Sequence, residues 1–192
     1  GTGTNWQDAV FQTAIQHTHQ VSAQGGTDKV QYYVSGTYMN QDGTIIGSNF
    51  DRLSLRSNLD AQLKNCLKLG LSVTYANTND DLKLADSEAG LITYSLTTPP
   101  NFQIYDINGN YSSVSQEGFT SPNPIAMAMY DDILLNRQNL NGNIFIEIKP
   151  LKNLTWHAEL GFDLGTSKGE TYEPMVSLGA WQRTTNSSRI QN

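Results

Sequence analysis

The sequence has little of what marks several common classes of protein. It contains a single cysteine, Cys66, among 192 residues, which excludes an internal disulfide bond. Positive charge is also scarce, because 12 Lys and Arg residues stand against 18 Asp and Glu residues and give a formal net charge of −6. Binding of nucleic-acid phosphates requires patches of Lys and Arg. We therefore predict no nucleic-acid partner.

Long apolar runs are missing as well. The mean hydropathy is −0.44, and the apolar run Ile125–Met129 is far shorter than the roughly 20 residues of a membrane-spanning helix. This excludes a helical membrane protein. A spanning β-barrel stays compatible, because its strands alternate lipid-facing and lumen-facing residues and are only moderately hydrophobic overall.

Alternation of apolar and polar residues is the strongest pattern present. In Leu53–Leu63 the odd positions are nearly all apolar, whereas the even positions are polar or charged. Five further segments alternate in the same way: His17–Ala23, Val30–Tyr38, Leu67–Tyr75, Leu140–Ile148 and Leu154–Leu164. Most have the roughly 9–11 residues of a tilted membrane-crossing strand, against about 5–6 in a typical soluble strand. We predict about six strands with one apolar face each.

The connections between these segments alternate between short and long. The short ones lie around Gly25–Lys29, Lys64–Cys66 and Lys149–Asn153. The long ones are Asn40–Asn49, an insert of approximately residues 79–136, and the polar stretch that follows Leu164 to Asn192. Outer-membrane barrels have short turns at one end and long loops at the other. The pattern predicts an all-β, antiparallel up-and-down meander that forms a partial transmembrane β-barrel with long outer loops.

Within the long insert and near the first residues, local signals predict ordered structure. Asn108-Gly109 is typical of a β-hairpin turn. Asn123-Pro124 predicts the start of a short helix with proline at its first position. Asn5 is a suitable N-cap for another short helix that follows it.

Several of these segments, taken in order, resemble a known family. The matching stretches are Asn5–Ala14, His19–Gly26, Tyr32–Tyr38, Asn40–Arg52, Leu55–Asp60, Asn123–Ala126, Asn141–Asn143 and Leu160–Asp163. They are similar to segments of the SusC/RagA family of TonB-linked outer-membrane proteins and cover nearly the whole chain in the right order. None of them is a catalytic signature.

The resemblance implies more than the spacing does. Such proteins are barrels of twenty-two strands with an N-terminal plug, in the outer membrane of Gram-negative bacteria. They import glycans or peptides with energy relayed through TonB, and a SusD-like surface lipoprotein serves as a lid. The implied partners are TonB through the plug region, the lipoprotein, an oligosaccharide or peptide substrate, and outer-membrane lipid. Because residues 1–192 contain neither plug nor TonB-binding segment, we expect them to be an interior segment of the barrel, without a cofactor.

Charged residues on the polar sides of the strands are expected to face the lumen. They are Arg52, Arg56, Asp60, Lys68, Glu147, Glu159 and Asp163. At the middle of the lipid layer a charge would cost about 2–4 kcal/mol, so these side chains must meet water or the plug. We expect the positive members to pair with Glu147, Glu159 and Asp163, or with the plug.

Aromatic residues are expected in two roles. Phe102, Tyr105, Tyr111 and Trp181 lie in predicted outer loops and are the candidate ligand-binding residues, because aromatic rings stack on sugars and grip peptide side chains; packing within the loops is the alternative. Tyr32, Tyr38, Tyr75 and Trp156 lie near strand ends on apolar faces. They fit an interfacial aromatic girdle, with the core of a β-sandwich as the alternative.

Catalytic and metal-binding patterns are not found. His17 and His19 are two residues apart, and His157 is a conceivable third ligand, but no Cys or carboxylate supports a zinc site. The acidic residues Asp42, Asp80, Asp81, Asp86 and Glu88 lack the spacing of a calcium-binding loop. We predict neither an enzyme nor a metal site. Two other classes stay open: a soluble all-β carbohydrate-binding or adhesion domain, and a β-rich glycan hydrolase with two carboxylates across a cleft.

Overall fold

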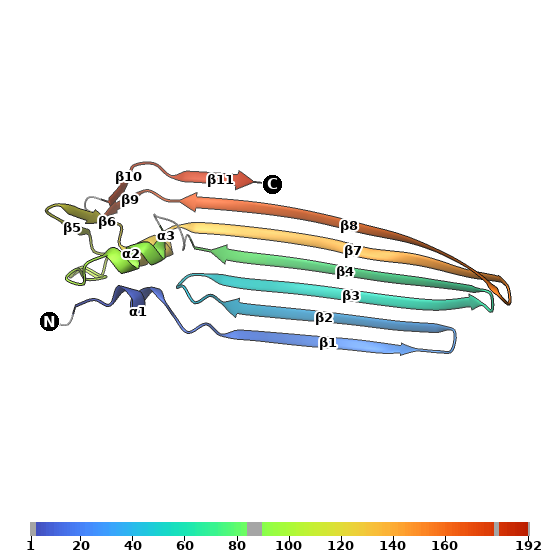
Figure 1. The fold of residues 1–192 in the computed structure, drawn as a ribbon. Coiled ribbons are helices and arrows are strands. Elements are labelled where there is room, and N and C mark those ends of the chain that lie inside the picture. The colour runs from blue at the N-terminus through green and yellow to red at the C-terminus, as the bar shows by residue number, and fades with distance from the viewer. Residues whose placement is uncertain (1–2, 84–89, 179–180, 192) are drawn as a thin grey trace.

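One antiparallel sheet dominates the computed structural model, which describes residues 3–83, 90–178 and 181–191 (Figure 1). Its seven strands follow the order β1-β2-β3-β4-β7-β8-β11. Their bounds are β1 Gln16–Gly26, β2 Val30–Asp42, β3 Asn49–Lys64, β4 Leu67–Leu82, β7 Asp132–Leu151, β8 Leu154–Glu173 and β11 Ser187–Gln191. Every neighbouring pair is antiparallel. The predicted meander is confirmed. Each of the six predicted segments lies inside its own strand of the large sheet, in the order β1, β2, β3, β4, β7 and β8.

The connections are sorted between the two ends of the sheet, as predicted. The tight β1–β2, β3–β4 and β7–β8 turns lie together at one end in Figure 1. The longer connections gather at the other end, where they form a cap. The cap contains α1 Trp6–Val10, α2 Leu91–Thr97, β5 Val114–Gln116, β6 Phe119–Ser121, α3 Pro124–Tyr130, β9 Val176–Leu178 and β10 Trp181–Arg183.

The register separates the side chains of the large sheet into an apolar face and a polar face. Residues directly opposite one another in neighbouring strands share a face. One such row on the apolar face consists of Leu55, Tyr75, Leu140 and Leu164. The adjacent row on the polar face consists of Arg56, Thr74, Asn141 and Asp163. The predicted two-sided strands are therefore present.

Large apolar side chains on the apolar face are exposed instead of covered. Leu160 is 71% exposed and Leu164 is 62% exposed. Both smaller sheets, β5–β6 and β9–β10, lie in the cap (Figure 1). The sandwich alternative is therefore wrong, because no second sheet within the described ranges lies over these side chains. An exposed apolar face on strands of this length fits contact with lipid.

Several strands extend beyond the segments that alternation predicts. β7 and β8 contain 20 residues each, and β4 continues to Leu82 while β7 starts at Asp132. The predicted loop insert of residues 79–136 therefore begins and ends in strand. Near the cap, polar residues occupy both faces of β4, so alternation disappears although pairing continues. Asn disfavours strands, but Asn136 donates side-chain hydrogen bonds to Asn77 and Asn79 across the sheet.

The hydrophobic core lies in the cap and not on the sheet. It is formed by buried residues of all three helices and β5: Trp6, Val10, Leu91, Val114, Ile125 and Ala128. The indole of Trp6 donates a hydrogen bond to the carbonyl of Pro99 (3.1 Å), which fixes α1 against the segment after α2. No helix within the described residues is both long enough and apolar enough to cross a membrane.

The predicted helix starts are confirmed. The Asn5 side chain accepts a hydrogen bond from the Asp8 amide at the start of α1. The Asn123 side chain accepts from the amides of Ile125 and Ala126, with Pro124 in the first turn of α3. Helix α2 was not predicted, because its N-cap is Gly90, which provides no side-chain cap. Strands β9, β10 and β11 were likewise not predicted, because each is short and lies in the polar stretch that follows Leu164.

Candidate functional site

The seven charged residues predicted for the lumen all lie on the polar face. The even positions of β3 lie opposite the even positions of β4. These lie opposite the odd positions of β7, which in turn lie opposite the odd positions of β8. This register places the following residues on one side of the sheet: Arg52, Arg56, Asp60, Lys68, Glu147, Glu159 and Asp163. The two rows nearest the turns, which hold Asp60, Lys68, Glu147 and Glu159, are directly adjacent.

The ion pairs on this face are mostly local. The Lys68 ammonium lies 3.3 Å from the Asp60 carboxylate, although it is directly opposite Glu147 in the register. Glu147 pairs with Lys149 of its own strand (2.9 Å), and Glu159 lies 3.7 Å from His157. Within the described residues, Lys68 therefore pairs with Asp60 of the neighbouring strand β3 and not with the carboxylate opposite it on β7.

Arg56 and Asp163 lie farther apart than such pairs. They share one row of the polar face, but Thr74 and Asn141 stand between them. Arg52 donates from its Nε to the Ser54 hydroxyl (3.1 Å). The side chains of Arg52, Arg56 and Asp163 at the middle of the polar face are all exposed.

An aromatic platform on the polar face was not predicted as part of a site. Phe145 stacks on His157 with ring centroids 5.4 Å apart, and the Lys68 ammonium lies 5.4 Å from the Phe145 centroid. The ring covers Gly70, where a Cβ would lie 1.9 Å from a ring carbon. Alternation does place Phe145 among the polar-face positions, but only the strand register shows that a glycine lies beneath it.

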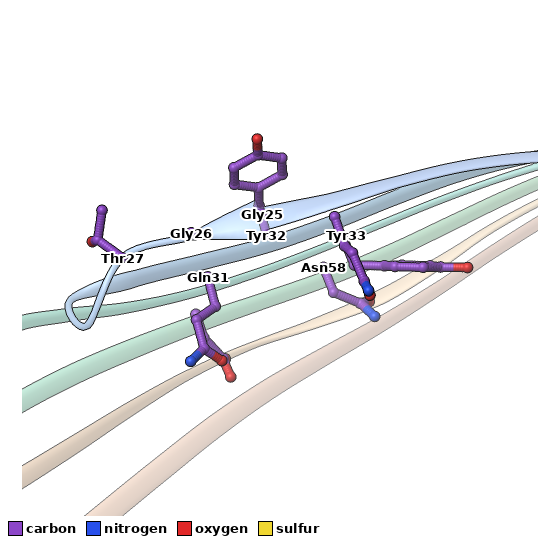
Figure 2. Close-up of a pocket in the computed structure, with 9 residues that line it drawn as sticks. Gly25, Gly26, Thr27, Gln31, Tyr32, Tyr33 and Asn58 are labelled. Carbon is purple, nitrogen blue, oxygen red and sulfur yellow. The ribbon is translucent and has the colours of Figure 1, made fainter.

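A polar hollow lies at the turn end of β1–β3. It has a volume of about 590 Å³ and is lined mainly by amide, hydroxyl and glycine groups of the first hairpin and β3. Figure 2 shows Gln31, Tyr33 and Asn58 pointing to one side of the sheet, whereas Tyr32 points to the other. Asp60 is the only charged residue in the lining. Such a surface can exchange hydrogen bonds with a peptide or a sugar, but it holds no nucleophile with an adjacent base.

The predicted ligand-binding aromatics divide into separate groups in the cap. Tyr105 and Tyr111 stack with centroids 5.3 Å apart, and Tyr111 meets Tyr130 edge-on at 5.4 Å. Phe102 and Tyr111 also pack on the core of the cap, whereas Tyr105 is 50% exposed. Trp181 is on a different hairpin, with the Arg183 guanidinium 5.4 Å from its ring. The structure thus brings Tyr105 and Tyr111 together.

A rigid hairpin presents Tyr105 at the surface. The predicted Asn108-Gly109 turn is confirmed, since Tyr105 and Tyr111 form a bridge and Gly109 has a φ of +84°. The Asp106 carboxylate accepts hydrogen bonds from the amides of Asn110 (2.9 Å) and Asn108 (2.8 Å). These bonds lower the pKa of Asp106. The hairpin is therefore ordered by its own turn before any ligand arrives.

An ionic cluster joins the cap to the ends of β4 and β7. The Lys83 ammonium lies 3.2 Å from Asp81 and 3.7 Å from Asp132. Arg183 of β10 donates to the Asp131 carboxylate. Burial raises the pKa of Asp131, and the Arg183 contact opposes this shift. Sequence patterns did not predict this cluster, because its members are distant along the chain.

The histidines do not form a common metal site. His17 and His19 are neighbours, with ring centroids 5.3 Å apart, on the same side of β1 as the apolar rows. His157 lies on the polar face, in the row of Glu147. Among residues 3–83, 90–178 and 181–191, no three His, Cys, Asp or Glu side chains are grouped closely enough to hold a metal ion. Asp86 and Glu88 lie outside these ranges.

Fold and faces together define a class of protein. An antiparallel meander with one exposed apolar face, one polar face, short turns at one end and long connections at the other is part of the wall of a transmembrane β-barrel. Over the residues that the structure describes the sheet is open, with β1 and β11 as its two edge strands.

Comparison with known proteins confirms the resemblance to TonB-dependent receptors. The chain is 26% identical over 181 residues to TonB-dependent receptor P3 of Formosa agariphila, covering 91% of the chain and 18% of that protein. It is 28% identical over 198 residues to TonB-dependent receptor SusC of Bacteroides thetaiotaomicron, covering 92% of the chain and 20% of SusC. No family model matches the sequence. The chain thus spans at most about a fifth of the length of these relatives.

A solved structure shares the fold. The structure of the RagAB peptide transporter aligns with 98% of this chain and 22% of the matched chain, with a TM-score of 0.79 and 24% identity. Structures of the RagAB peptide importer in its closed-closed and open-open states align equally well. The open sheet and its cap therefore match part of a larger transporter fold.

Proposed function

We propose that this chain forms part of the barrel wall and outer cap of a TonB-dependent importer in the outer membrane of a Gram-negative bacterium. The observation that carries the proposal is the seven-stranded sheet with an exposed apolar face and a charged polar face. Similarity to TonB-dependent receptors over about nine-tenths of the chain supports it. The polar face lines the lumen in this proposal, with the turn end toward the periplasm and the cap outside.

The proposed cargo is an oligosaccharide or a peptide, captured with the help of a SusD-like surface lipoprotein. Two features of the chain support this part. The cap presents aromatic rings for stacking, above all Tyr105. The polar face offers amides and ion pairs that can exchange hydrogen bonds with passing cargo or with a plug. Contact with TonB is proposed to pass through the plug, outside these residues.

Uptake by living cells tests the proposal. Cells that lack the gene are expected to lose uptake of the labelled oligosaccharide or peptide mixture, and a protonophore should abolish uptake in the parent strain, because TonB-linked import requires energy. Restoring the full-length gene should restore uptake. Uptake that persists in the deletion strain, or that is unchanged by the protonophore, would contradict an energised importer.

The same assay tests the cap. In the full-length protein, Tyr105→Ala is expected to weaken cargo capture by about 3–10-fold, since one aromatic contact contributes roughly 0.5–1.5 kcal/mol. Leu96→Ala is the control, because Leu96 is another exposed apolar residue of the cap, at 62% against 50% for Tyr105. Equal uptake by both variants, at equal amounts in the membrane, would show that Tyr105 does not contact cargo.

A further inference from the structure

The apolar face changes its chemistry along the strands toward the cap. From Ile148 to Leu140, the outward residues of β7 are apolar or glycine. Two residues farther along, the row holds Leu53, Asn77 and Gln138, and the next row holds Asp51, Asn79 and Asn136. The strands therefore continue past the apolar band with an outward surface rich in amides and charged groups, among which Leu53 and Leu134 are the apolar residues of β3 and β7.

The depth of these rows follows from strand geometry. Ile148 and Leu140 are separated by roughly 26 Å along the strand, or about 20 Å along the membrane normal at a tilt near 40°, which fills most of an apolar band about 25 Å tall. Asn136 lies another four residues on, about 10 Å above the last apolar row by the same arithmetic. That is the layer of lipid headgroups on the cap side of the membrane.

The side chains in this layer are held in order by one another. We call Asp51, Asn77, Asn79 and Asn136 the amide ladder. Asn79 donates to the Asp51 carboxylate (2.7 Å), and Asn136 donates to the side-chain oxygens of Asn77 (3.0 Å) and Asn79 (2.5 Å). Each amide carries two donor hydrogens and an acceptor oxygen. The ladder therefore keeps hydrogen-bonding capacity for an outside partner.

A hollow of about 620 Å³ lies along the ladder and is lined in part by Asn49, Lys168 and Glu170. Three of its carboxylates have cationic partners. Asp81 and Glu170, whose strand positions face outward, pair with Lys83 and Lys168, and Asp80 on the polar face pairs with Arg137. The surface is thus nearly balanced in charge, with no excess of positive charge to attract a bare phosphate. Hydroxyl groups, which donate and accept in turn, match it better.

We propose that the amide ladder binds the saccharide headgroup of a glycolipid in the outer leaflet of the membrane. The inference rests on the proposed barrel function, which sets the depth of the ladder. Continuity with the lipid-facing band favours a membrane-anchored sugar over a soluble one, since the lipid tails of such a molecule would lie on the apolar rows directly below. The ladder then selects lipids around the barrel by their sugars.

Glycolipid retention by the full-length protein tests this inference. The protein would be placed in phospholipid nanodiscs with and without rough lipopolysaccharide, and bound lipopolysaccharide counted by native mass spectrometry. The double variant Asn79→Ala with Asn136→Ala is expected to retain at least fivefold less lipopolysaccharide. The matched control, Thr78→Ala with Asn139→Ala, changes the same two strands on the polar face and should stay within twofold of the parent protein.

Equal retention by ladder and control variants overturns the inference. Displacement by lipid-free core oligosaccharide at micromolar concentration overturns the membrane source in favour of a soluble sugar. A ladder variant that changes only the mass peak of a protein dimer, with lipopolysaccharide retention unchanged, overturns the inference in favour of binding by a second copy of the protein. A heat-shift gel separates the two proposals: a protein that inserts but retains no lipopolysaccharide contradicts the ladder alone, and one that never inserts contradicts the barrel.

Discussion

Ile144→Arg is expected to lower the free energy of unfolding in lipid by about 2–4 kcal/mol, the cost of a charge at the middle of the bilayer. Ile144 is 49% exposed and belongs to the central row of the apolar face, between Leu71 and Leu160. A guanidinium there would meet lipid tails with no partner to neutralise it. Denaturant titration of the full-length protein in lipid vesicles, followed by heat-shift gel mobility, would measure the loss.

Asn141→Arg provides the matched control. Asn141 is exposed three residues away on the same strand but on the polar face, in one row with Asp163. A positive charge in that position meets water and a neighbouring carboxylate, so we expect a change in unfolding free energy within about 0.5 kcal/mol, as for ordinary surface substitutions. Two equally destabilised variants, or a reversed order, would show that the faces are assigned wrongly.

Asn123→Ala is expected to unfold the cap while the sheet stays folded. Asn123 is 1% exposed, and its side chain donates to the carbonyls of Ile104 (2.9 Å) and Ser112 (3.1 Å). It also accepts from the amides of Ile125 and Ala126 at the start of α3. Loss of a helix cap costs about 0.5–2 kcal/mol, and each buried group without a partner costs about 1–3 kcal/mol. The sum is comparable to the stability of a small unit.

Hydrogen exchange would locate the effect. Amides of residues 104–112 and 124–130 should exchange much faster in Asn123→Ala, whereas those of β4 and β7 keep their protection. Asn123→Asp is the informative second variant, because its carboxylate still caps α3 but cannot donate to Ile104 and Ser112. It should loosen the hairpin more than the helix. Unchanged exchange in the alanine variant would mean that the core of the cap holds without this side chain.

The sequence predicted the sheet well because the surroundings of a membrane strand repeat every second residue. Leu53–Leu63 shows this directly, and all of it lies inside β3 with its odd positions on one face. The strand ends were predicted less well. Beyond Tyr75 both faces of β4 carry polar residues, so Asn77 and Asn79 resemble a loop although they pair with β7.

The site was predicted only where local signals exist. Asn108-Gly109 fixed the hairpin that presents Tyr105, and Asn123-Pro124 fixed the start of α3. The donor bonds of Asn123 reach back to Ile104, 19 residues away, and the Phe145 ring depends on Gly70 of another strand. Such contacts depend on which distant segments lie side by side in the fold, which composition and alternation do not specify.

The central claim is that alternate residues of these strands face lipid and water. Spin labels placed one at a time at positions 140–148 of β7, in full-length protein with Cys66→Ser, measure it most directly, because Cys66 is exposed and would otherwise be labelled. The account predicts that labels at 140, 144, 146 and 148 collide with lipid-soluble oxygen, whereas labels at 141, 143, 145 and 147 collide with a water-soluble nickel chelate. Equal access to both quenchers along the strand, or oxygen access without a period of two, would contradict it.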